Sequence, residues 1–246
     1  TVETVVDGGF GRSNNAYLTA GDSIGILADL TGESYIAAGA LSASGNAALG
    51  ATVDTAVYQN AVTVTVDNAV LNAKCQVLSS REIRVPNRED RRRGVVVSAT
   101  SDNSIMTFAV SGGVSSNVAV VGVVNTLVVE NRMKALVGRR EELSDNHSES
   151  ENGETAYAEI LSGGDILVQA EDDSDLVDAA GALAIGGGSA GAGATVVTLV
   201  YNKTVHAKMD TDAASAEGDV SVLANSADDV YLLAVSFGAS GTAGVA

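Results

Sequence analysis

The chain has 246 residues, a formal net charge of −17 and 46% apolar residues, but only 4% aromatic residues. Much of the apolar content is Ala and Val rather than Leu, Ile and Phe, so we expect a thin core of small side chains. The acidic charge argues against nucleic acid and anionic membranes as partners held by the overall electrostatic field. One Cys and two His exclude a disulfide framework and a multi-cysteine metal site, and these counts argue against an enzyme.

A short motif that ends in alanine recurs four times along the chain. It reads GDSIGILA at 21–28, more loosely GVVVSA at 94–99, GDILVQA at 164–170 and GDVSVLA at 218–224. The spacings between the closing alanines are 71, 71 and 54 residues, and these alanines are Ala28, Ala99, Ala170 and Ala224. Recurrence of one motif at such spacings is typical of repeat architectures.

A second block alternates along the chain with period two. ATVDTAVY at 51–58 matches ATVVTLVY at 194–201, and VNTLVV at 124–129 fits the same frame, as expected for β-strands. Polar residues follow both blocks in every copy, and we expect chain corners there; they include Asn60, Asn131, Lys203, Asp29, Asp102, Asp172 and Asp228. Strips of Gly, Ala and Ser separate the blocks, at 39–50, 111–122, 181–193 and 238–246.

These patterns predict an all-β fold, a parallel β-helix or solenoid built from repeats of about 54 residues with two charged insertions. With corners at the polar positions, a coil would hold roughly 18 to 27 residues, and each unit would make two or three turns. The alternative is a string of tandem small antiparallel β-sandwiches.

The repeat spacing divides the chain into five parts. We expect the tail of a preceding repeat and a linker at 1–20, a repeat with a basic insertion (67–93) at 21–93, a repeat with an acidic insertion (138–163) at 94–163, a bare repeat at 164–217 and a truncated repeat at 218–246. Both insertions are expected at one point of the unit, after the second block. Because residues 1–7 align with 204–210, the chain is interpreted as a window cut from a longer array.

The charged insertions are the candidate interaction sites. Residues 67–93 hold seven basic and four acidic residues (+3), and residues 138–159 hold two basic and seven acidic residues (−5). The candidate interaction residues are Arg88, Arg91, Arg92, Arg93, Glu141 and Glu142. Either both segments are solvated loops, or they are complementary protrusions that pair within one rod or between neighbours. Only a network of pairs would hold, because an exposed ion pair contributes about 0 to 1 kcal/mol.

Other motifs carry less weight. GGSAG at 187–191 matches the nucleophile elbow G-x-S-x-G, but it lies in a glycine strip with no helix after it, so no catalytic residue is expected. Asp172, Asp173 and Asp175 are candidate calcium ligands, with solvated turn carboxylates as the alternative, and no other cofactor is expected. The uncharged runs 105–129 and 179–202 are long enough to span a bilayer, but their repeat context favours buried strands, so no membrane contact is expected.

The GDVSVLA opening, the Gly/Ala strips and the Thr-Val-x-Ala strand resemble the repeat arrays of giant bacterial exoproteins, the filamentous-haemagglutinin-like adhesins and leukotoxin-type secreted proteins. The resemblance implies a β-helical segment that is extracellular or on the cell surface, and it carries over no site residues. The expected function is a structural or adhesive rod or filament-forming element. Its partners would be neighbouring repeats, copies of itself, and a host surface or matrix. Two alternatives are part of a leukotoxin-like cytotoxin with membrane-active Gly/Ala strips, and a β-helical polysaccharide enzyme.

Overall fold

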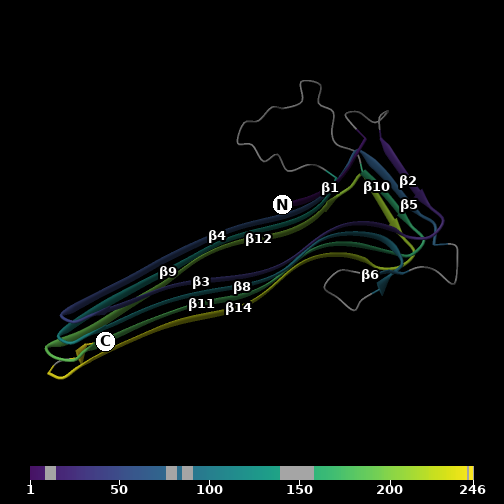
Figure 1. Ribbon diagram of the computed structural model, residues 1–246. Helices are drawn as coiled ribbons and strands as arrows, with labels where there is room; N and C mark the ends of the chain where they lie inside the picture. The colour runs from purple at the N-terminus through teal and green to yellow at the C-terminus, as the bar shows by residue number, and fades with distance from the viewer. Residues whose placement is uncertain (9–14, 76–81, 85–90, 139–157, 243, 246) are drawn as a thin grey trace.

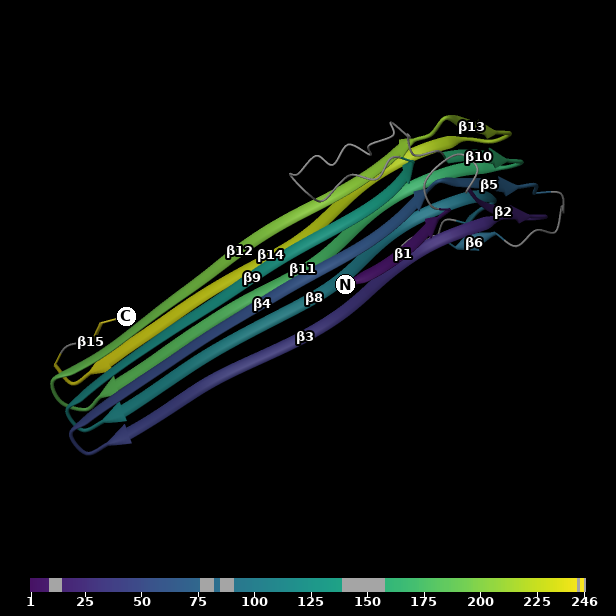
Figure 2. The same cartoon turned by 90° about the horizontal axis from the view of Figure 1, so that it is seen from above.

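The computed structural model describes residues 1–8, 15–75, 82–84, 91–138, 158–242 and 244–245. These residues form strands and the turns between them, with no helix (Figure 1). The chain repeatedly follows the same wide path, so strands far apart in the sequence lie side by side as successive coils (Figure 2).

Each of the first three coils contains one short strand and two long strands. Sheet I holds the first long strands: β3 (Ile24–Ser44), β8 (Gly94–Ser115), β11 (Asp165–Gly186) and β14 (Val220–Ser240). Sheet II holds β1 (Val2–Asp7), the second long strands β4 (Ala47–Asp67), β9 (Val118–Gly138) and β12 (Ala190–Asp210), and β15 (Gly244–Val245). Sheet III holds the short strands β2 (Ala16–Ala20), β5 (Ala69–Ala73), β10 (Ala158–Ser162) and β13 (Ala213–Ala216).

All strand pairs within these three sheets are parallel, which confirms the predicted all-β fold of parallel strands over the antiparallel sandwiches. Two short strands, β6 (Ile83–Arg84) and β7 (Arg91–Arg92), form a separate antiparallel pair. The four marker alanines are register partners across sheet I, as the repeat alignment predicted: Ala28, Ala99, Ala170 and Ala224. β1 likewise pairs with the last part of β4, so residues 1–7 occupy the end of a sheet II strand.

The predicted number of turns is wrong, because each unit makes one coil rather than two or three. The polar positions expected as corners, such as Asn131 and Asp172, lie inside long strands, where their side chains are buried. A strand can continue through such a position when the facing sheet supplies hydrogen-bond partners. A long strand of 21 residues spans about 70 Å at about 3.3 Å per residue, so each coil is wide and flat.

The two insertions do not enter at the same point of the coil. The basic segment was expected from residue 67, but 69–73 form β5, and the extra residues follow that strand. The acidic segment was expected to continue to residue 163, but 158–162 form β10, and the extra residues precede it. The basic insertion therefore follows its short strand of sheet III, whereas the acidic insertion precedes its short strand.

The core changes character along the coil. We call the end with sheet III proximal and the end with the turns between the two long strands distal (Figure 1). The proximal core contains fully buried branched residues such as Val64, Leu71 and Ile160. The distal core is built mainly from alanine, including Ala109, Ala119 and Ala184, as expected for a thin interior of small side chains.

Candidate functional site

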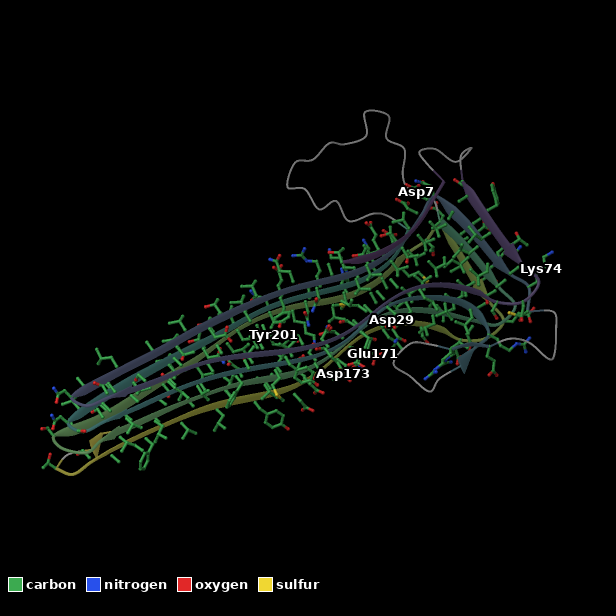
Figure 3. The ribbon with its side chains drawn as sticks, viewed as in Figure 1. Asp7, Asp29, Lys74, Glu171, Asp173 and Tyr201 are labelled. Carbon is green, nitrogen blue, oxygen red and sulfur yellow. The ribbon has the colours of Figure 1, made fainter. Side chains whose placement is uncertain are left out.

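A layer of polar side chains crosses the interior near the middle of the long strands, beside Tyr201 (Figure 3). Sheet II contributes three register partners, Asn60, Asn131 and Lys203. The amide of Asn60 donates to Oδ1 of Asn131 at 3.2 Å, and the amide of Asn131 donates to Oδ2 of Asp172 at 3.2 Å. Ser174 Oγ also donates to Oδ2 of Asp172, at 2.9 Å. This layer links the two long sheets by side-chain hydrogen bonds.

Lys203 carries the only positive charge among these side chains. Its Nζ lies 2.7 Å from Oδ2 of Asp172 and 2.5 Å from Oδ1 of Asp228, and Tyr201 Oη donates to the same Asp228 oxygen at 2.6 Å. The side chain of Lys203 is 12% exposed and that of Asp172 is fully buried. Because Asp228 belongs to the next coil, the lysine joins two successive coils of sheet I.

The pKa shifts follow from these contacts. Burial by itself would lower the pKa of Lys203, but its hydrogen bonds to Asp172 and Asp228 outweigh burial and raise the pKa above its ordinary value. Burial by itself would raise the pKa of Asp228, but its bonds to Lys203 and Tyr201 outweigh burial and lower it. Both shifts stabilise the ionised pair in the folded chain.

A second polar group lies in the distal half. The amide of Asn125 donates to Oδ1 of Asp178 at 2.5 Å, and Thr107 Oγ1 donates to the same oxygen at 2.9 Å. Burial raises the pKa of Asp178, the bond from Thr107 opposes this, and the carboxylate of Asp54 raises it further. The hydrogen bonds to this carboxyl group among the described residues come from neutral side chains, in contrast to Asp172, which pairs with Lys203.

The candidate calcium residues point to two different sides of sheet I. Asp172 is buried inside with Lys203, whereas Asp173 and Asp175 lie on the outer face, because successive residues of a strand point to opposite faces. Asp173 and Asp175 instead neighbour Asp102 and Asp229, their register partners. Among the described residues, no group of three or more His, Cys, Asp or Glu side chains is placed to hold a metal ion.

The outer carboxylates of sheet I crowd one another. Burial raises the pKa of Asp173, and the charges of Asp102 and Asp175 raise it further, although Lys203 opposes them. Like charges on adjacent strands are destabilising, so this acidic row reduces stability unless something outside the chain compensates for it.

The described part of the basic segment lies against the coils of its own chain. Arg92 Nη1 lies 3.4 Å from Oδ2 of Asp165, and Arg93 donates to the backbone oxygen of Cys75 at 2.9 Å. Ile83 packs on a patch of sheet I around Val96. Of the other candidate interaction residues, the side chain of Arg91 and all of Arg88, Glu141 and Glu142 lie outside the described residues.

The GGSAG segment forms the distal turn between β11 and β12 and the first residues of β12. A strand follows it rather than the helix of a nucleophile elbow. A Cβ at Gly191 would lie 2.2 Å from the backbone oxygen of Ala239, so glycine is required by the close approach of β14 from sheet I. This contact gives the glycine strip a packing role.

The sequence pattern predicted chain corners at the residues of the polar layer, and so it did not show that these side chains link the two long sheets inside the coil. One signal was present, since Asn60, Asn131 and Lys203 occupy the same position in successive repeats.

The described residues contain no helix long and apolar enough to cross a membrane. Comparisons with protein-family models, curated proteins and solved structures find no match to this chain.

Proposed function

We propose that the chain is a non-enzymatic structural element of a large bacterial surface or secreted repeat protein, and that its wide coils stack into a ribbon. The observation that carries the proposal is the in-register stacking of equivalent positions, exemplified by the four marker alanines. The resemblance to giant exoprotein repeats supports an extracellular location and an adhesive or matrix-building role.

The width of the coil favours a ribbon over a simple spacer. Neighbouring strands lie about 4.8 Å apart, so a repeat of 54 or more residues adds only about 4.8 Å along the stacking axis. A spacer of given length would need far fewer residues with narrow coils. The residues in each coil instead build faces about 70 Å wide. The wide faces indicate that the fold serves to present a broad surface for contacts at the sides of the stack.

Further coils or further copies of the chain can pair with the edge strands of sheet I. β3 and β14 are the two edges of sheet I, and each has one side free of strand pairing among the described residues. An unpaired parallel edge is a template for another strand. We expect a second copy to add its β3 beside β14 and continue the stack.

Electron microscopy of the purified chain at increasing concentration tests this role. The expected particles are ribbons about 70 Å wide that lengthen with concentration, with a repeat of about 4.8 Å along their length in fibre diffraction. A proline at Asn225 or at Ser226 supplies matched variants, because adjacent residues present their backbone groups to opposite sides of β14. One of the two should stay folded and stop elongation; wild-type particles that never elongate would contradict the proposal.

The leukotoxin-like cytotoxin is the second candidate. It is favoured by the exposed apolar side chains at the distal end, such as Leu41 and Phe237, which lie within or beside the Gly/Ala strips. Release of a trapped dye from liposomes at concentrations that give no ribbons would favour this candidate over the structural role.

A further inference from the structure

The distal half of sheet I has an outer face without charge. Its outward residues come from 35–43 on β3, 106–114 on β8, 177–185 on β11 and 231–239 on β14, and we call them the apolar band. Large side chains in the band are well exposed, for example Leu41 at 91% and Phe237 at 54%. An exposed apolar surface of this extent marks a contact surface in soluble proteins.

The distribution of side-chain size across the distal half is inverted. On β8, Phe108 and Val110 point outward, whereas Ala109 and Ser111 between them are buried in the interior. Large apolar side chains normally occupy the interior, because removing them from water is the main gain of folding. The inversion indicates that the outer face is itself buried when the protein works.

We propose that the apolar band packs face to face against the same band of a second copy of this chain. The inference rests on the proposed structural role and deepens it by naming the lateral partner. Two ribbons joined in this way form a double layer.

The area of the band fits such a contact. Its four strands span about 19 Å at about 4.8 Å per strand, and its nine residues per strand span about 30 Å. Each copy would contribute about 570 Å², and the pair would bury on the order of 1,100 Å², which is above the roughly 1,000 Å² that a specific interface needs.

The relief of the band suits another sheet. Two adjacent rows alternate small and large residues from strand to strand: Ala37, Phe108, Ala179, Leu233 and Gly39, Val110, Gly181, Val235. β8 and β14 therefore form ridges there, and β3 and β11 form grooves. The next outward row has the opposite relief on three strands: Leu41, Gly112, Leu183 and Phe237. When a second copy runs in the opposite direction with all four strands overlaid, Phe108 therefore faces Gly112 and Leu41 faces Ala37. Fluid lipid chains would need no such relief, so a sheet is the better match.

Charge sets the relative direction of the two copies. A row containing Glu33, Asp175 and Asp229 borders the proximal side of the band. Copies running in the same direction would bring these rows together, and like charges would repel. Copies running in opposite directions overlay their bands and hold the acidic rows at opposite ends.

The test replaces Leu233 and Val235 together by Glu. These side chains are 58% and 53% exposed, so the folded coil can accept them. The matched control replaces Val53 and Val200 by Glu on the outer face of sheet II, where they are 72% and 43% exposed. Circular dichroism checks that both variants keep the strand content and melting temperature of the wild type.

Sedimentation equilibrium is measured in the proline variant that stops elongation. We expect this variant to be a dimer, to remain one with the sheet II control and to become a monomer with Leu233→Glu and Val235→Glu. On the otherwise unchanged chain, the band variant should still elongate, but into ribbons half as thick. A monomer at about 100 µM before the band is changed, or equal dissociation by the control, would overturn the inference.

The outcomes separate the two proposals. Dimers without any ribbons would leave the band contact standing and contradict the structural role, whereas ribbons without dimers would do the reverse. Binding of the monomer to uncharged phosphatidylcholine vesicles that is lost in Leu233→Glu and Val235→Glu would assign the band to lipid and overturn the inference.

Discussion

Replacing Lys203 by Met tests whether the buried ion pair stabilises the stack. The change leaves Asp172 fully buried without its cation. Removing one partner of a buried pair costs about 3 to 5 kcal/mol. Because Asn131 and Ser174 still donate to Asp172, we expect the lower end, about 3 kcal/mol. For a chain of this size, that loss lowers the melting temperature by about 6 to 12 °C.

The repeat supplies a matched control for this variant. Lys203 and Asp172 occupy the positions of Asn131 and Ser101 in the preceding coil. The double variant Lys203→Asn with Asp172→Ser therefore gives this coil the two residues that the fold already holds at the equivalent positions. We expect it to lie within about 1 kcal/mol of the wild type, because no charge is left buried.

Thermal melts of the wild type, Lys203→Asn, Asp172→Ser and the double variant form a double-mutant cycle, and Lys203→Met is melted beside them. The pKa of Lys203 is raised on folding, so its stabilisation is present at neutral pH and is lost as the pH rises through that raised pKa. The wild type should therefore lose stability above pH 10.5 relative to the double variant. If Lys203→Met melts within about 2 °C of the wild type at pH 7, the ion pair does not stabilise the stack.

Further predictions concern packing and charge. Gly191→Ala should cost about 1 to 3 kcal/mol because its Cβ meets the Ala239 backbone, whereas Gly122→Ala, with no atom within 4 Å, should be neutral; equal melting temperatures would contradict the close approach. Asp173→Asn should stabilise the chain by about 0.2 to 1 kcal/mol at low salt by removing repulsion from Asp102 and Asp175. Because the pKa of Asp173 is raised above 3.8, this gain is full at neutral pH and disappears as the pH falls through the raised pKa towards 3.8, which melts across pH will check.

The repeat alignment was sufficient to predict which residues stack. Identity between copies requires that equivalent residues occupy equivalent places, so the marker alanines could be placed from spacing alone. The parallel direction follows as well, because copies stacked with the same orientation run the same way.

The sequence pattern could not predict the length of the coil. Asp172 and Asn131 have the composition of a turn, and only the facing sheet shows that their hydrogen bonds are made inside. The outer band was hidden for a related reason. Period two identifies a strand, but where both faces are apolar, as around Val110, it does not say which face is inside.

The spacing between hydrogen-bonded strands has a consequence for folding kinetics. Each long strand of sheet I finds its neighbour 54 or 71 residues away, so closing the first pair fixes a long loop before any ladder forms. The first contact between two coils should therefore be slow. Once one folded edge exists, the next coil can pair along its whole length. Such a chain would fold fastest when it is delivered progressively from one end, with each finished coil acting as the template for the next.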